Sequence, residues 1–306
     1  MIGIKKAYFA AILYSFIIGF SFIFVKIALI EASPMDTLAH RFTIAFIIAT
    51  IIILVKKIPV KVTMRDVWTI LPLTMLYPAF FFTFQVFGLV YTSSSEAGII
   101  QATIPIFTLI LATFFLKEYS GSWQKASIFL SVAGVIFIFI MNGFNVEGYS
   151  VKGTVLILLS AFSASLYNVL ARKLTKKYSL FTLTYVMTAF GFITFNGIAM
   201  TNHLVENSFA SFFSPFLSMS FLASILYLGV LSSLCTSFLS NYALSKMEAS
   251  KMSVFSNLAT LITVIAGVIF LNETLQYYHI VGTIVILTGV VGTNYFGKKR
   301  SSVRDE

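Results

Sequence analysis

Two carboxylates stand in the same four-residue motif at two places in the chain. Residues 115–118 read Phe-Leu-Lys-Glu, and residues 270–273, which lie 155 positions later, read Phe-Leu-Asn-Glu. Paired carboxylates can serve general acid–base chemistry, so Glu118 and Glu273 invite a catalytic interpretation. Each glutamate also stands where one apolar run ends and another follows. There a carboxylate can cap the following helix and interact with its positive N-terminus. We favour the capping interpretation and expect no enzymatic activity.

Metal, redox and nucleotide chemistry find little support in the sequence. His40, His203 and His279 are far apart, and Cys235 is the single cysteine. One cysteine leaves no intramolecular disulfide and no cysteine cluster for zinc or an iron–sulfur centre. The sequence has no G-x-x-x-x-G-K-[ST] loop to hold phosphates. We therefore expect no metal and no cofactor.

Polar side chains inside long apolar runs are the remaining candidates for chemistry. Several recur at helical spacing, as Ser253, Ser256 and Thr260 do. The candidates for ligand contact are Tyr77, Gln85, Gln101, Tyr167, Asn168, Asn241 and Asn257. Apolar surroundings cannot satisfy the donors and acceptors of an amide. A ligand or a neighbouring helix must supply the partners, and spacing leaves both alternatives open. For the hydroxyls, helix packing is the favoured interpretation.

The composition is that of a protein embedded in lipid. Of the 306 residues, 58% are hydrophobic and 10% are charged, whereas a soluble domain carries about 25% charged residues. Apolar runs of about 20 residues recur along the chain, which is typical of a polytopic helical membrane protein. The net charge of +10 is spread over short loops rather than gathered in one basic domain. We therefore expect the lipid bilayer, not nucleic acid, as a partner, and a monomer as the assembly.

Ten apolar runs predict ten membrane-spanning helices, because lipid admits only helices or closed barrels. The helices are expected at 7–30, 37–55, 67–90, 94–116, 123–141, 153–171, 180–201, 217–245, 250–271 and 277–297. All of the 21 basic residues except Lys26, Arg41 and Lys152 fall on the side of the N-terminus. By the positive-inside rule, this distribution predicts that both termini face the cytoplasm.

Three prolines fall inside the predicted spans. Pro72, Pro78 and Pro105 each remove a backbone donor and are expected to kink their helices. In a protein that changes conformation, such points can serve as hinges.

Two cations also fall inside the predicted spans. Lys26 and Arg41 each lie about five residues from the outer end of a helix, which is about 7 Å deep. Long cationic side chains can extend to the surface, where Glu31, Asp36 and Glu96 are available as partners. The alternative is an outer-vestibule charge that attracts anionic groups or forms a gate salt bridge. The sequence leaves both interpretations open.

The chain reads as one unit of about 150 residues written twice, with halves at 1–148 and 149–306. At the 155-residue displacement, Ser95 matches Ser250 and Gly134 matches Gly289. Each half holds five predicted spans, and because five is odd, the second half would enter the membrane upside down. The predicted fold is an all-α membrane protein of ten transmembrane helices in two inverted five-helix repeats. Such halves can exchange conformations and open a central site to alternate sides.

This ordered set of residues resembles the drug/metabolite transporter superfamily, specifically its EamA-type members. The residues that resemble the family's first hairpin are Gly19 to Phe22, Lys26, Pro34, Arg41 and Phe42. Those that resemble its third-to-fourth helix signature are Tyr91 to Ser95, Gln101, Pro105, Leu116 and Glu118. The second half is looser, with Thr260 in place of the proline, and Phe20 departs from the Trp-Gly of many members. The resemblance covers nearly the whole chain and implies transport of small metabolites, often export, without fixing the substrate.

The sequence thus predicts a multi-pass permease of the cell membrane. It would move a small metabolite, such as an amino acid or a related amphipathic compound, outward by alternating access. Coupling would be to the proton gradient or to exchange. Two alternatives from other classes stay open. One is a lipid-modifying membrane enzyme, which would need a catalytic constellation that the sequence does not display, and the other is a passive sensor or scaffold.

Overall fold

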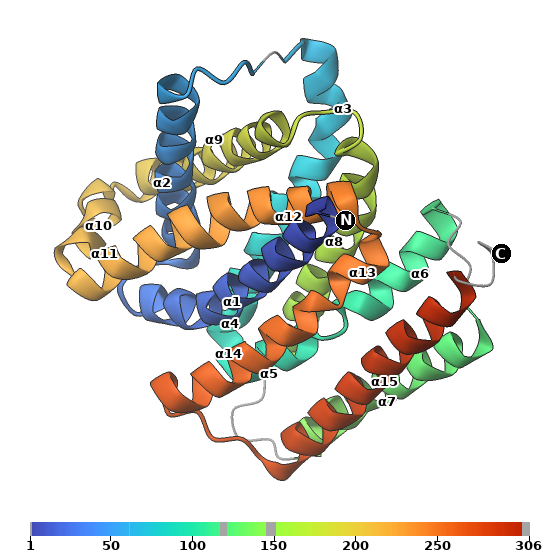
Figure 1. The fold of residues 1–306 in the computed structure, drawn as a ribbon. Helices are drawn as coiled ribbons and strands as arrows, with labels where there is room; N and C mark the ends of the chain where they lie inside the picture. The colour runs from blue at the N-terminus through green and yellow to red at the C-terminus, as the bar shows by residue number, and fades with distance from the viewer. Residues whose placement is uncertain (1, 61, 117–120, 145–150, 302–306) are drawn as a thin grey trace.

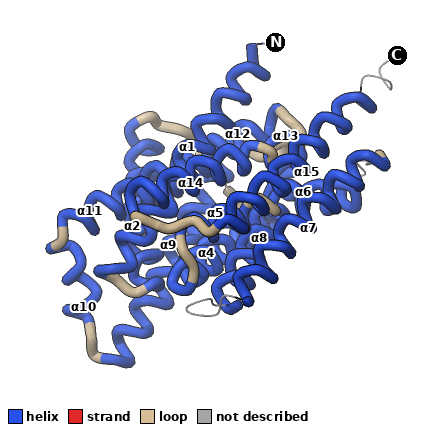
Figure 2. The backbone as a smooth tube through the Cα atoms, turned by 90° about the horizontal axis from the view of Figure 1, so that it is seen from below, coloured by secondary structure: helices blue, strands red, loops and turns tan. Residues whose placement is uncertain are grey.

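The structure, a computed structural model, describes residues 2–60, 62–116, 121–144 and 151–301, and within these ranges it consists of helices and loops (Figure 2). Glu118 lies outside the described residues. Eight helices are long and apolar enough to cross a membrane. Four of them are α1 (Ile2–Glu31), α2 (Pro34–Val55), α8 (Val151–Leu174) and α9 (Leu180–Glu206). The other four are composite rods at Met64–Tyr91, Ser94–Leu116, Met219–Lys246 and Ala249–Leu271.

Two further helices correspond to the spans predicted at 123–141 and 277–297. They are α7 (Ser122–Phe144) and α15 (Tyr277–Ser301). The apolar stretches found in them, Lys125–Ile138 and Tyr277–Gly289, are shorter than a span. Eight of the predicted spans are therefore confirmed as helices of sufficient length, whereas a total of ten crossings stays a prediction. The short α10 (Phe209–Phe213) and the 3-10 turn η2 (Ser214–Leu217) lie between α9 and the next rod.

Side chains and backbone geometry explain where several helices begin and end. Thr63 with Asp66, and Ser93 with Glu96, form capping boxes, in which each side chain satisfies a backbone N–H of the other residue. The rod at Ala249–Leu271 ends at Asn272, whose φ of 52° is the left-handed conformation that asparagine tolerates. This turn sends the chain sharply away from the helix axis.

Two rods are interrupted near their middles by π-helical segments. The rod at Met64–Tyr91 consists of α3 (Met64–Thr74), η1 (Met75–Phe80) and α4 (Phe81–Tyr91). The rod at Met219–Lys246 consists of α11 (Met219–Leu226), η3 (Tyr227–Cys235) and α12 (Thr236–Lys246). Met219 follows Met64 by 155 residues, which is the displacement of the sequence repeat. The two interruptions therefore occupy equivalent places in the two halves.

The prolines account for only part of this geometry. The helix is kinked at Pro78, where Tyr77 has extended backbone angles (φ −143°, ψ 113°) and the bond between the two residues is cis. Pro105 lies in the first turn of α6 (Ile104–Leu116), just after a break that separates it from α5 (Ser94–Gln101). Pro72 lies inside α3 without a break.

The rod at Ala249–Leu271 is the second-half equivalent of the rod at Ser94–Leu116, and it is interrupted without any proline. There α13 (Ala249–Ser253) is separated from α14 (Phe255–Leu271) at Val254, although Thr260 stands where the first half has its proline. The break therefore belongs to the architecture of this rod in both halves, and proline is not its only cause.

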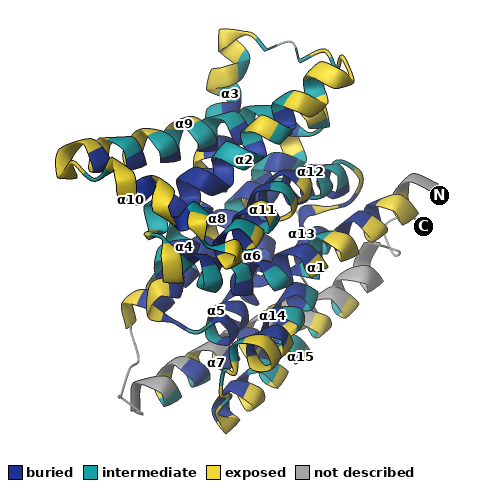
Figure 3. Cartoon of the chain, turned by 90° about the vertical axis from the view of Figure 1, so that its left-hand side faces the viewer, coloured by how far each residue is buried: buried dark blue, intermediate teal, exposed yellow. Residues whose placement is uncertain are grey.

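The main packing contacts of α1 have counterparts in those of its equivalent, α8. α1 packs against α14 and α12 as α8 packs against α6 and α4. α2 packs against its own equivalent α9, and α7 packs against its own equivalent α15. The α7–α15 pair forms one edge of the molecule (Figures 1 and 3), while the buried residues gather where the other helices meet (Figure 3).

α7 and α15 run antiparallel and approach closely. A Cβ atom on Gly282 would clash with Ile138, and one on Gly292 would lie 2.6 Å from the hydroxyl of Ser127. The residue numbers on α15 therefore rise as those on α7 fall. Small residues at such a crossing let the two backbones come together, as is usual for helix pairs in membranes.

The same contact occurs twice at this crossing, with the roles of the helices exchanged. A Cβ atom on Gly289 would clash with Ser131, and one on Gly134 would lie 2.9 Å from the Ile286 side chain. Residues 131 and 286 are 155 apart, as are residues 134 and 289. Reciprocal contacts of this kind are the mark of a two-fold interface.

Candidate functional site

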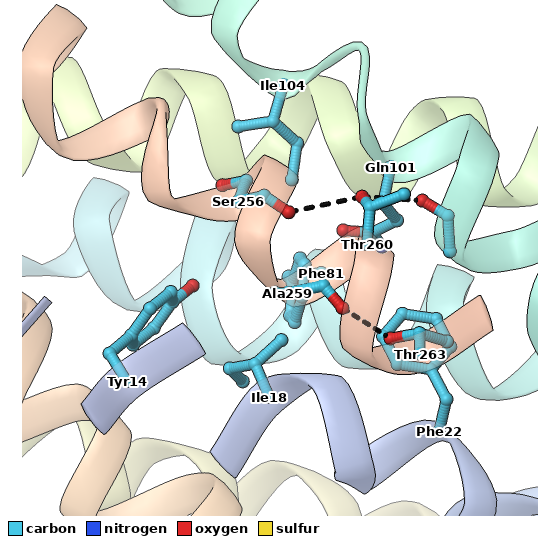
Figure 4. Close-up of a pocket in the computed structure, with 11 residues that line it drawn as sticks. Tyr14, Ile18, Phe22, Phe81, Gln101, Ile104, Ser256, Ala259, Thr260 and Thr263 are labelled. Atoms are coloured by element: carbon cyan, nitrogen blue, oxygen red, sulfur yellow. Dashed lines mark hydrogen bonds between the residues drawn. The ribbon is translucent and has the colours of Figure 1, made fainter. Parts of the chain in front are cut away.

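A small cavity lies between α1, α4, α5, α6 and α14 (Figure 4). Tyr14, Phe81 and Gln101 line it from the first half, and Ser256 and Thr260 line it from the second. The lining is completed by Ile18, Phe22, Gly98, Ile104, Ala259 and Thr263. The free space admits about one water molecule. A metabolite could enter only if the helices moved apart.

The threonines of α14 hold the surrounding helices together. Thr260 donates a hydrogen bond to the backbone oxygen of Gly98 (2.9 Å), and Thr263 donates one to the backbone oxygen of Gly19 (2.9 Å). The glycines permit this approach, since a Cβ atom on Gly98 would lie 2.8 Å from a methyl carbon of Thr263. These two threonines therefore serve helix packing.

Other polar groups of the lining are available to the cavity. The Gln101 Nε2 donates to the Ser160 hydroxyl (3.2 Å), and that hydroxyl donates to the backbone oxygen of Phe81 (3.0 Å). The hydroxyls of Tyr14 and Ser256 make no hydrogen bond to the part of the chain that the structure describes. The Tyr14 ring points toward α14 (Figure 4). Hydroxyls from both halves thus face one small space.

An aromatic group adjoins the cavity. The rings of Tyr77 and Tyr167 stack with centroids 4.8 Å apart, and the ring of Tyr77 lies 5.0 Å from that of Phe81. The Tyr167 hydroxyl donates to the Asn241 Oδ1 (3.0 Å), and the Asn241 amide donates to the Thr184 hydroxyl (3.3 Å). The structure thus brings three of the predicted residues, Tyr77, Tyr167 and Asn241, into one group beside the cavity that Gln101 lines.

The other three predicted amides lie apart from the cavity lining. Gln85 is buried, and neither of its amide atoms has a hydrogen-bond partner among the described residues. The Asn257 Oδ1 is in the same situation, and Asn168 is also buried. These residues stay candidates without a shared site.

The two predicted cations have different surroundings. Lys26 is half-buried on α1, within electrostatic range of Glu273 and Glu96. Arg41 is fully buried rather than placed in an open vestibule, and it contacts η3. Asp36, a predicted partner for these cations, instead contacts His203 (2.8 Å).

The sequence led us to expect that Glu273 caps the helix that follows it, but the structure shows a different contact. Its carboxylate accepts hydrogen bonds from the backbone N–H groups of Ser94 (2.6 Å) and Ser95 (2.8 Å) and from the Ser95 hydroxyl (2.6 Å). It therefore caps α5 in the other half of the chain. Gly267 makes room, because a Cβ atom there would lie 2.5 Å from both the carboxylate and the Ser95 hydroxyl. We call this contact the Glu273 clamp.

Sequence reasoning missed Tyr14 and the target of Glu273. Tyr14 stands alone in an apolar run without a polar stripe. The repeat gave no signal either, because the residue 155 positions after Tyr14 is the apolar Val169. Ser95, the residue that Glu273 contacts, was already known from its match with Ser250 in the repeat. The repeat spacing does not show, however, which side chains contact each other.

Apolar helices of spanning length, an internal repeat and a cavity lined from both halves are the features of a polytopic membrane transporter. The EamA-like transporter family matches residues 5–140 and again residues 151–295, and the chain belongs to this family. It is therefore a multi-pass membrane protein of a transporter family, as the resemblance in the sequence implied.

Relatives agree over nearly the whole length. The uncharacterized transporter YcxC of Bacillus subtilis (strain 168) is 56% identical over 295 residues, covering 96% of this chain and 95% of that protein. An uncharacterized transporter of Archaeoglobus fulgidus is 27% identical over 281 residues, covering 89% and 92%. A solved protein crystal structure has a similar fold, with a TM-score of 0.66 at 14% identity over 97% of this chain and 98% of that one.

Proposed function

We propose that this family member is a secondary transporter that exports a small metabolite, such as an amino acid or a related amphipathic compound. It would reside in the cell membrane with both termini in the cytoplasm. The observation that carries the proposal is the cavity between the halves, where Gln101 and Tyr14 face Ser256. A site at a repeat interface is where alternating access requires the substrate to bind.

The proposed mechanism is a rocking motion of two inverted five-helix halves, 1–148 and 149–306. The reciprocal contacts of Ser131 with Gly289 and of Gly134 with Ile286 support a two-fold relation between them. The matched interruptions at η1 and η3 add support, because a π-helical segment makes bending possible in the middle of a rod. Equivalent halves of this kind can exchange conformations.

The Glu273 clamp supplies a gate for this motion. It joins the loop after α14 to the start of α5, so it fastens the two halves together on one side of the membrane. With the termini in the cytoplasm, that side is the outer one. Opening the cavity outward would require the carboxylate to leave the Ser94 and Ser95 amides, which solvent could then hydrate.

Flux measurements test the proposal. Purified protein in proteoliposomes should give saturable flux of some member of an amino-acid, sugar and drug panel, above that of empty liposomes. The direction can be read from cells, where overexpression should raise the metabolite in the medium and deletion should lower it. Absence of flux in both directions for the whole panel would contradict the proposal.

A passive sensor and a membrane-embedded enzyme are the competing functions. A sensor would bind a ligand without moving it across the bilayer, so ligand binding without flux would favour it. An enzyme would convert the compound, which mass spectrometry of the same proteoliposome samples would reveal. Neither has a specific observation in the structure in its favour.

A further inference from the structure

Arg41 is the largest fully buried side chain in the described part of the protein. Its Nε donates to the Ser233 hydroxyl (2.6 Å), and its Nη2 donates to the hydroxyl (2.8 Å) and backbone oxygen (3.2 Å) of Ser232. Its Cζ lies 3.8 Å from the centroid of the Phe82 ring. The remaining nitrogen, Nη1, is buried and has no hydrogen-bond partner among the described residues.

No carboxylate in the described residues neutralises this guanidinium. Three acidic groups toward the same end of α2 are held elsewhere. Asp36 contacts His203 (2.8 Å), Glu31 accepts a hydrogen bond from Ser218 (3.0 Å), and Glu273 caps α5. A buried charge without a counter-charge is strongly unfavourable. An ionisable residue inside a membrane span therefore indicates a functional site.

The Tyr77 hydroxyl is a second unused polar group beside Arg41. Tyr77 is buried, its hydroxyl lies near Thr236 and Ser237 without a well-aligned hydrogen bond, and it is within electrostatic range of Arg41. Both side chains pack against Phe82, whose ring centroid lies 4.9 Å from that of Tyr77. Two N–H groups of Arg41 and one O–H group of Tyr77 in the same region thus have no hydrogen-bond partner among the described residues.

The place of this region in the fold is informative. Tyr77 lies in η1, and the Arg41 partners Ser232 and Ser233 lie in η3. The cation therefore contacts η3 directly and lies within electrostatic range of Tyr77 in η1. π-Helical segments occur frequently at functional sites. A change in the contacts of Arg41 would act directly on η3, one of the two points where the rods can bend.

Only one half of the molecule carries this cation. α2 (Pro34–Val55) contains Arg41, whereas its equivalent α9 (Leu180–Glu206) contains no lysine or arginine. The repeat architecture therefore does not require a cation in this helix.

We propose that Arg41 is the recognition group for a carboxylate on the transported metabolite. Its Nη1 and the Tyr77 hydroxyl would donate to the two carboxylate oxygens, in charge-assisted bonds of the kind that arginine forms with carboxylates. A single cation matches a monoanion better than a phosphate dianion. The inference rests on the proposed transport function and restricts it to substrates with one carboxylate.

Ligand-dependent thermal unfolding of the purified full chain tests the site. The probes are monocarboxylates (amino, hydroxy, keto and aromatic acids), each compared with its own primary amide. At least one acid should raise the melting temperature where its amide does not. Tyr77→Phe, which removes only the hydroxyl, should weaken the binding of that acid about tenfold. Arg41→Gln should abolish it, and Arg41→Lys should retain part of it.

Lys152→Gln is the matched control. Lys152 is an exposed cation over an aromatic ring, 4.6 Å from the Tyr91 centroid, and far along the sequence from the site. Its loss should leave acid binding unchanged. If Arg41→Gln does not fold, Tyr77→Phe still decides, because it leaves the charge in place.

Three results would overturn the inference. They are stabilisation by no acid of the panel, equal stabilisation by acids and amides, and acid binding of wild-type strength in Tyr77→Phe. Flux measurements distinguish a failure of the carboxylate-site inference from a failure of the proposed transport function. Transport of a substrate without an anionic group would support the transport function and contradict the carboxylate site. Acid binding without flux of any panel member would contradict transport and keep the site.

Discussion

At the residue scale, Gln101 is the predicted amide that both lines the cavity and forms a hydrogen bond with the protein. Its Nε2 is held by Ser160, so the side chain is oriented before any ligand arrives. The cost of fixing that side chain is then already met by folding, which favours binding. This separates Gln101 from Gln85, whose amide atoms have no partner in the described residues and which does not line that cavity.

Gln101→Leu should therefore impair transport more than it impairs folding. Loss of a polar contact to ligand should raise the apparent KM about tenfold, while the one lost hydrogen bond should lower stability by about 1 kcal/mol. Flux and thermal unfolding on the same preparation measure the two effects. Gln276→Leu, on an exposed glutamine in a loop, is the control and should change neither. An unchanged KM in Gln101→Leu would remove Gln101 from the site.

Glu273 makes a second prediction at this scale. Glu273→Gln removes the charge from three hydrogen bonds to α5 and should lower the free energy of unfolding by about 2 kcal/mol. Gly267→Ala should act in the same direction, because its Cβ atom would displace the carboxylate. Glu206→Gln, which alters an exposed glutamate at the end of α9, is the control. Wild-type thermal stability in both clamp variants would show that the Glu273 clamp does not contribute to the free energy of unfolding.

Residue identities were easier to predict than their partners. Tyr77 was a predicted candidate, and its ring contacts that of Phe81, which lines the cavity. Periodicity also found Gln101, but it gave no reason to choose Ser160 as its partner. The partner of an amide or a carboxylate is decided by tertiary packing, so Glu273 reached across to Ser95 where local capping was expected.

At the element scale, close helix crossings depend on glycine. Gly289→Ala and Gly134→Ala should each destabilise the α7–α15 pair by about 1–3 kcal/mol, which is the usual cost of overpacking. Because the two contacts are reciprocal, the two losses should be similar. Gly197→Ala is the control, since a Cβ atom there meets nothing within 4 Å. Loss of stability in Gly197→Ala, with none in the other two, would contradict this packing.

Helix positions were predictable because they follow from the length of apolar runs, whereas interruptions were predictable only where proline causes them. Pro78 predicted the kink beside Tyr77. No residue predicted the break at Val254 or the π-helical segment η3, because neither contains a proline. These two interruptions match interruptions at equivalent positions in the first half, and this match is visible only in the structure.

At the scale of the whole molecule, the charge distribution predicts the orientation. In a background with Cys235→Ala, single cysteines at Ser211 and Lys176 report the two sides, since both positions are exposed. A membrane-impermeant thiol reagent should label Ser211→Cys in intact cells and Lys176→Cys only after permeabilisation. The reverse pattern would invert the orientation and place the Glu273 clamp at the cytoplasmic side.

The central claim is that one cavity opens to alternate sides under the control of the Glu273 clamp. It is tested most directly by the reactivity of Gln101→Cys, in the Cys235→Ala background, in right-side-out and inside-out membrane vesicles. We predict that the impermeant reagent reaches this cysteine from both sides. Adding Glu273→Gln should raise the labelling rate from outside and lower it from inside. Labelling from one side only, at a rate that Glu273→Gln leaves unchanged, would contradict the account.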